Sequence, residues 1–138
     1  MILKYHIRGG DFVNAGKASS DIKRVLKQLN VSPVRIKRVV IALYESEVNV
    51  VAHAREGEIE ALIESEWIQL TVSDRGPGIE DLELAMKEGF STASKEVREM
   101  GFGAGMGLPN IKRNSDHLDI STRPGEGTVV RIKNQLKD

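Results

Sequence analysis

The sequence predicts a single α/β domain that spans residues 1–138. Two long segments, 14–29 and 33–55, carry apolar residues at the three- and four-residue spacing of helices. Shorter segments, 58–64 and 67–73 among them, alternate apolar and polar residues, as strands with one buried face do. A chain of this length can bury one hydrophobic core, so we expect no second domain.

Composition excludes several functional classes. The 20 basic and 20 acidic residues cancel, so no overall field attracts nucleic acid or an anionic membrane. The chain has no cysteine, which excludes disulfides, thiolate metal sites and thiol nucleophiles. The three histidines lie far apart in the sequence, with no grouping of carboxylates or cysteines around them, so no transition-metal site is expected. The N-terminus does not resemble a signal peptide and no apolar run is long enough to cross a membrane, so we expect a cytoplasmic protein.

The N-terminal half predicts an edge strand followed by two helices. Leu3, Tyr5 and Ile7 alternate with polar residues before a Gly-Gly turn, which indicates a strand at the edge of a sheet. Ser32-Pro33 supplies an N-cap and a proline at the first helical position of the second helix. Apolar residues of this helix point in nearly every direction, so it is expected to be buried on all sides.

Polar residues on the second helix need a reason. Glu45, Asn49 and His53 stand four apart, on one side of the helix, where they could converge on one ligand or only hydrogen-bond a neighbouring loop. Three polar residues in register on a buried helix favour a functional site. Glu47 projects roughly opposite to Glu45, and we expect it to face solvent at a gap.

The predicted strands 58–64 and 67–73 would form a hairpin, and the second strand would be followed by a carboxylate that points towards the core. The period of two along the second strand puts Asp74 on its apolar face, so Asp74 needs a hydrogen-bond donor. Gly76 and Gly78 then permit a tight reversal and the close approach of a flat group. The alternative is that Asp74 only caps this turn.

The second half predicts a lid and a phosphate-binding loop. Residues 88–103 are mostly polar without a clear period and are bracketed by glycines, which indicates a mobile lid. Four alternating glycines then precede a helix expected to reach Ser115, and its free N–H groups favour an anion such as a nucleotide phosphate. A plain flexible loop is the alternative. The remaining elements are a short helix at 79–86 and strands at 117–122 and 128–133.

Four segments occur in the order and spacing of a set of ATP-binding boxes. They are Glu45-Ser-Glu-Val-Asn49, Asp74-Arg-Gly-Pro-Gly78, Gly103-Ala-Gly-Met-Gly-Leu108 and Gly127-Thr128. Together they resemble the GHKL superfamily, which includes gyrase, histidine kinases and mismatch-repair ATPases. The resemblance spans most of the chain and implies the Bergerat fold, an α+β two-layer sandwich with a mixed, mostly antiparallel sheet and helices on one face. The chain's size, the Asn49-x-x-x-His53 continuation and Gly89-Phe-Ser-Thr92 are most similar to small bacterial anti-sigma-factor and switch-protein serine/threonine kinases.

The resemblance implies that the chain binds ATP and Mg²⁺. Asp74 would accept a hydrogen bond from the adenine amino group and repel the guanine carbonyl, which selects ATP over GTP. Gly76 and Gly78 would let the base lie against the backbone, and the Thr128 hydroxyl would support the base and Asp74. Asn49 would bind Mg²⁺ through its carbonyl oxygen. Backbone N–H groups would hold the phosphates, from Gly103, Gly105, Met106, Gly107 and Leu108.

Glu45 indicates the type of chemistry. In the superfamily a glutamate at this position is the usual general base, whereas histidine kinases usually carry another residue there. Lys95 or Arg98 in the lid would reach the terminal phosphate. The first hypothesis is therefore an ATP- and Mg²⁺-dependent serine/threonine protein kinase that phosphorylates a small STAS-type partner, an anti-anti-sigma factor.

Other functions and assemblies stay open. The rival hypothesis is a nucleotide-dependent binding module that sequesters or activates a sigma factor or another regulator, with phosphotransfer slow or absent. A histidine-kinase catalytic domain is less favoured, because the chain has no room for a phospho-accepting helical hairpin. The first strand could form a homodimer through its edge, although Lys4, His6 and Arg8 could instead protect that edge against pairing.

Overall fold

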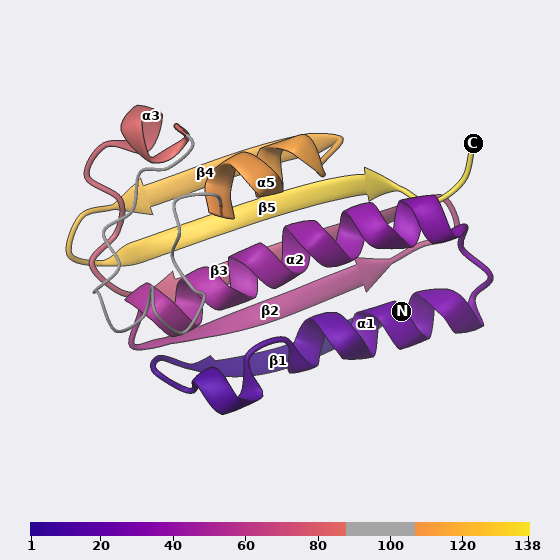
Figure 1. Ribbon diagram of the computed structural model, residues 1–138, viewed down its shortest axis with the longest axis horizontal. Coiled ribbons are helices and arrows are strands. Elements are labelled where there is room, and N and C mark those ends of the chain that lie inside the picture. Colours follow the sequence, from indigo (N-terminus) through magenta and orange to yellow (C-terminus); the bar gives the residue numbers. More distant parts are fainter. Residues whose placement is uncertain (88–106) are drawn as a thin grey trace.

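A computed structural model describes residues 1–87 and 107–138, which form a five-stranded sheet with helices across one face (Figure 1). This architecture confirms the predicted α/β class with one layer of helices. In chain order the elements are β1 (Ile2–Arg8), the 3-10 turn η1 (Phe12–Asn14), α1 (Lys17–Gln28), α2 (Pro33–His53), β2 (Glu56–Ile63), β3 (Trp67–Arg75), α3 (Leu82–Ala85), α5 (Gly107–Arg113), β4 (His117–Arg123) and β5 (Gly127–Gln135). The predicted lid falls on residues outside the described part of the chain.

The strand order is β1-β2-β3-β5-β4, and each neighbouring pair of the described strands is antiparallel. The resemblance implied a mixed, mostly antiparallel sheet; the described strands contain no parallel pair. Strand β1 lies at one edge, as its alternation predicted. The hairpin β2–β3 is also confirmed, with Ile63 opposite Ile68 on either side of the turn.

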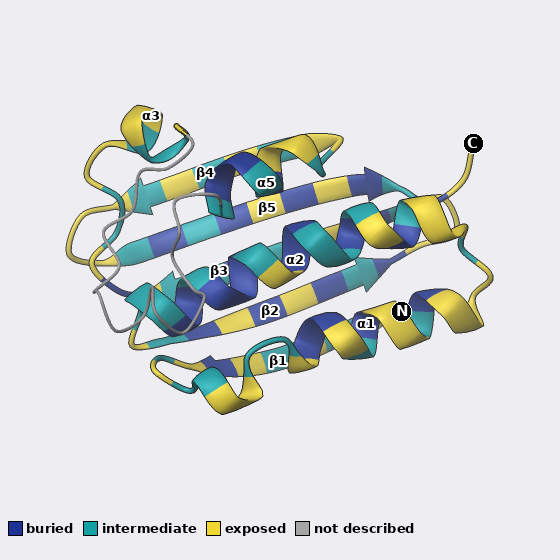
Figure 2. Cartoon of the chain, in the orientation of Figure 1, coloured by how far each residue is buried: buried dark blue, intermediate teal, exposed yellow. Residues whose placement is uncertain are grey.

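The core lies between the sheet and α2. Alternate residues of β2 and β3 are buried on the face that α2 covers, including Ile59 and Leu70, and they pack with Val39 and Leu43 of the helix (Figure 2). Helix α2 also contacts α1 on one flank and α5 on the other. The end of β3 and the last turn of α2 therefore lie at the same end of the sheet (Figure 1).

Helix α2 is not buried on all sides, so that prediction was wrong. Tyr44 is 38% exposed and Val34 is 73% exposed. The sheet and the two neighbouring helices cover three directions around α2, and its outer face remains open to solvent (Figure 2). The apolar residues on this outer face had suggested that a further element covers it, but no described element does so.

Glu47 does not face solvent, which corrects a second prediction. Its side chain is 3% exposed and points at the start of α1. Its carboxylate accepts hydrogen bonds from the backbone N–H groups of Gly16 (2.9 Å), Ala18 (3.3 Å) and Ser19 (3.1 Å), and from the Ser19 hydroxyl (2.7 Å). The free N–H groups at a helix N-terminus favour an anion, and α1 has no cap from its own N-cap residue, Gly16. Glu47 therefore caps α1 from the neighbouring helix.

The ends of the helices differ from the predicted ones by a few residues. Helix α1 begins at Lys17 instead of Asn14, because η1 occupies the preceding residues and Gly16 has a φ of 95°. Helix α2 ends at His53. Helix α3 covers four residues where eight were predicted, and the Asp81 side chain caps it by accepting a hydrogen bond from the Leu84 N–H at 3.0 Å.

Candidate functional site

Asp74 lies near the end of β3, and glycine residues lie next to its carboxylate. Its Oδ1 accepts a hydrogen bond from the Thr128 N–H at 3.1 Å, which confirms that this carboxylate has a donor partner. A Cβ atom added to Gly76 or Gly127 would lie 3.4 Å or 3.1 Å from Asp74 Oδ1. Its Oδ2 has no hydrogen bond to a described residue. Burial raises the pKa of Asp74, and the bond from Thr128 opposes that rise. Among the described residues, Oδ2 of Asp74 therefore has no hydrogen-bond partner, and glycine backbone lies next to this carboxylate.

Thr128 contacts Asp74 through its backbone, so the predicted hydroxyl contact to Asp74 was wrong. The Thr128 hydroxyl instead lies 2.9 Å from the hydroxyl of Thr122, its cross-strand partner on β4. Thr122 Oγ1 also accepts a hydrogen bond from the Ile79 N–H at 2.8 Å, which ties the loop after Asp74 to the sheet. Sequence reasoning missed Thr122, and the only signal was its register opposite Thr128.

Gly76 and Gly78 are required by the protein's own packing. Gly78 has a φ of 73°, and a Cβ atom there would lie 2.5 Å from the Arg123 carbonyl oxygen. A Cβ atom on Gly76 would lie 3.0 Å from the Cα of Ala54, just past the end of α2. The two glycines thus allow the turn after Asp74 to pack against the last turn of α2 and the β4–β5 turn. Their predicted contact with a base stays a prediction.

Asn49 and the end of the glycine run meet between α2 and α5. A Cβ atom on Gly107 would lie 3.1 Å from Asn49 Oδ1 and 3.3 Å from its Nδ2. The predicted metal ligand therefore lies directly against the first residue of α5, where two of the predicted phosphate-binding residues, Gly107 and Leu108, are found. The other three, Gly103, Gly105 and Met106, are outside the described residues, as are Lys95 and Arg98.

Glu45 lies one turn before Asn49 and faces the same helix. Its Oε1 accepts a hydrogen bond from Asn110 Nδ2 of α5 at 3.5 Å. The carboxyl group is half-buried, and this burial raises its pKa, while the bond from Asn110 opposes the rise. Glu45 and Asn49 thus both contact α5, while their predicted convergence on one ligand stays a prediction. His53 forms no hydrogen bond with a described residue, and burial lowers its pKa.

Comparison with known proteins agrees with this geometry. Residues 12–134 match the family described as the histidine kinase-like ATPase domain. The chain belongs to the histidine kinase-like ATPase family. Within this family it is 32% identical over 124 residues to the anti-sigma F factor of Thermoanaerobacter sp. (strain X514), covering 86% of this chain and 83% of the relative. It is 31% identical over 119 residues to the serine/threonine-protein kinase RsbT of Bacillus subtilis (strain 168), covering 83% and 84% of the two chains.

A solved structure shows the same ATPase-family fold. The crystal structure of the RsbU and RsbW domains of a Mycobacterium tuberculosis protein matches with a TM-score of 0.62 and 16% sequence identity. The match covers 97% of this chain and 32% of the larger one. At this identity the likeness concerns the fold alone. Among the described residues, no helix has the length and apolar character needed to cross a membrane.

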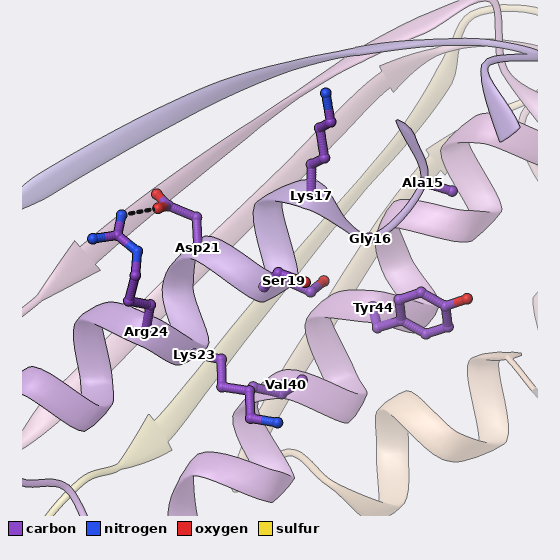
Figure 3. A pocket seen from close by; sticks show the side chains of 10 residues that line it. Ala15, Gly16, Lys17, Ser19, Asp21, Lys23, Arg24, Val40 and Tyr44 are labelled. Carbon is purple, nitrogen blue, oxygen red and sulfur yellow. Dashed lines mark hydrogen bonds and ion pairs between the residues drawn. The ribbon is translucent and has the colours of Figure 1, made fainter. Parts of the chain in front are cut away.

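A surface cavity of about 660 Å³ lies between α1 and α2, apart from these candidate site residues (Figure 3). Tyr44 and Val40 of α2 line it together with residues around the start of α1, and Arg24 pairs with Asp21 on its α1 side. It shares no residue with the set predicted to bind ATP.

Proposed function

We propose that the chain is an ATP- and Mg²⁺-dependent serine/threonine protein kinase of the anti-sigma-factor and switch-kinase type. The supporting observation is that the amide of Asn49 lies against Gly107 at the start of α5, while the turn after the half-buried Asp74 packs on Ala54 at the end of the same helix α2. The relatives named anti-sigma F factor and serine/threonine-protein kinase RsbT support the same activity.

Asp74 would recognise adenine. Its Oδ1 is occupied by the Thr128 N–H, so Oδ2 is the atom that would accept the adenine amino group. Guanine carries a carbonyl at that position, and a carboxylate facing it would be repelled. The base would lie against the backbone of the glycines next to Asp74, since glycine has no side chain to keep a flat group away.

Asn49 and the start of α5 would hold the metal and the phosphates. The amide oxygen of Asn49 is a hard ligand of the kind Mg²⁺ prefers, and the described residues contain no cluster of His, Asp or Glu that could hold a metal instead. The N–H groups of Gly107 and Leu108, with those of Gly103, Gly105 and Met106, would face the phosphates. Bound Mg²⁺ would offset phosphate charge and orient the terminal phosphoryl group.

Glu45 would act as the general base. A serine hydroxyl of the partner would give its proton to the Glu45 carboxylate while its oxygen attacks the terminal phosphorus, and the bond to the ADP oxygen would break. Burial raises the pKa of Glu45, which makes the carboxylate a better proton acceptor than an exposed glutamate.

The partner would be a small STAS-type regulator, an anti-anti-sigma factor, and the protein would act in the cytoplasm. A sigma factor is a further partner, because the relative from Thermoanaerobacter is named an anti-sigma factor. That name also favours a second function, in which ATP-dependent binding of the partner is the activity and phosphotransfer is slow or absent. A homodimer through the free edge of β1 belongs to the same proposal.

Phosphate transfer from labelled ATP to a purified STAS-type partner tests the kinase proposal. We expect transfer by the parent protein and its loss in Glu45→Gln, with ATP binding retained in both. Glu58→Gln, an exposed glutamate on β2, is the matched control and should transfer normally. If the parent binds ATP and partner but transfers no phosphate, the kinase proposal fails and the binding module remains.

A further inference from the structure

Asn110 is the hydrogen-bond partner of Glu45 among the described residues. It lies one turn into α5, and its Nδ2 donates to Glu45 Oε1 at 3.5 Å. Glu45 has no other hydrogen bond to a described residue. The carboxylate of the proposed base is thus oriented from the helix that begins at the phosphate-binding loop.

Arg113 fixes the direction of the Asn110 amide. Its Nη1 donates to Asn110 Oδ1 at 3.4 Å. A guanidinium group can only donate hydrogen bonds, so the amide oxygen must face Arg113 and the NH₂ group must face Glu45. The opposite orientation would place two donors together at Arg113 and two acceptors together at Glu45.

Two further asparagines, Asn114 just after α5 and Asn134 on β5, link Asn110 to the sheet. Asn114 Nδ2 donates to the Asn110 backbone carbonyl at 2.8 Å, and Asn134 Nδ2 donates to the Asn114 carbonyl at 2.7 Å. Asn134 is 1% exposed on β5, and its Oδ1 accepts a hydrogen bond from the Asp116 N–H at 2.8 Å. A buried side chain of the sheet thereby holds the C-terminal end of α5.

We propose that Asn110 is a positioning residue for Glu45, held in place by Asn114 and Asn134. This inference rests on the proposed role of Glu45 as the base. A neutral amide suits that role, because it orients the carboxylate through Oε1 without supplying a positive charge that would weaken its basicity. Oε2 then remains to take the serine proton.

A double-mutant cycle tests whether Asn110 acts through Glu45. Asn110→Ala should lower the transfer rate about tenfold, the size of a lost hydrogen bond to a charged group, and leave the ATP dissociation constant within about twofold. In the Glu45→Gln background the same change should alter the residual rate less than about twofold. Lys112→Ala, an exposed residue of the same helix, is the control and should behave like the parent. An equal loss in both backgrounds, or a parallel loss of ATP affinity, would overturn the inference.

A second readout separates this inference from the kinase proposal and needs no activity. In the ATP-free protein, carbon-13 NMR of the Glu45 carboxyl should give a higher titration midpoint in Asn110→Ala than in the parent, because the donor that favours the ionised form is gone. Asn110→Asp keeps the size and the acceptor for Arg113 but sets a carboxylate against Glu45, so it should raise the midpoint further. Unchanged midpoints in both folded variants would refute the positioning role, whereas raised midpoints without any phosphate transfer by the parent would refute only the kinase proposal.

Discussion

Replacing Glu47 should destabilise the fold more than replacing any exposed glutamate. Glu47→Ala removes the common acceptor of three backbone N–H groups and one hydroxyl at the start of α1. The bonds to Ala18 and Ser19 are buried, and a buried donor left without a partner costs about 1–3 kcal/mol. The freed donors and the lost favourable interaction with the helix dipole together give an expected cost of about 3–5 kcal/mol.

The amide variant Glu47→Gln removes only part of this set of hydrogen bonds. Glutamine keeps one acceptor oxygen, which can still serve the Gly16 and Ala18 N–H groups. Its NH₂ group would face Ser19, whose hydroxyl can reverse and accept, but the Ser19 N–H loses its acceptor. We expect a cost of about 1–2 kcal/mol, smaller than that of the alanine variant.

Urea unfolding followed by the fluorescence of Trp67, the single tryptophan, measures these differences. Glu58→Ala is the control and should change the free energy of unfolding by less than about 0.5 kcal/mol. A capping role for Glu47 would be ruled out if Glu47→Ala cost no more than this control, or if the alanine variant were the more stable of the two Glu47 variants.

Three further predictions concern the nucleotide site. Asp74→Asn should abolish ATP binding in calorimetry, yet be at least as stable as the parent at neutral pH. Burial raises the pKa of Asp74, so this group makes the parent less stable as pH rises through that raised pKa. Urea unfolding at pH 4 and 7 should therefore show a smaller loss of stability in the variant than in the parent. Gly107→Ala should weaken Mg²⁺-dependent ATP binding roughly tenfold with little change in stability, because its methyl group would lie 3.1 Å from Asn49 Oδ1; equal affinities with and without Mg²⁺ in the parent would contradict this. Gly78→Ala should lower the free energy of unfolding in urea by at least about 2 kcal/mol. An alanine there would have to adopt a φ of 73°, and its Cβ atom would lie 2.5 Å from the Arg123 carbonyl oxygen. An unchanged free energy of unfolding would mean that the turn relaxes freely.

Periodicity was sufficient to predict the elements that decide the fold. Strand β1, the hairpin β2–β3 and the long helix after Ser32-Pro33 each follow from a local sequence pattern. Each lies close to its predicted position. The inward direction of Asp74 followed from the same rule, since the period of two continues to the end of β3.

Contacts between elements could not be predicted in the same way. Glu47 was placed in solvent because its partner, the uncapped start of α1, is 28 to 31 residues away along the chain. Thr122 and Asn110 act through strand register and helix packing, which a local pattern does not contain. For the same reason the outer face of α2 was misjudged, because apolar spacing indicates which residues are apolar and not how many neighbours surround the helix.

The most direct test of the nucleotide site is an NMR titration of the parent protein with Mg²⁺-ATP. We expect saturable shifts in the Asn49 side-chain amide and in the backbone signals of Asp74, Gly76, Gly107 and Leu108, and much weaker shifts with Mg²⁺-GTP. No binding, or shifts gathered around Tyr44 and the start of α1, would contradict it.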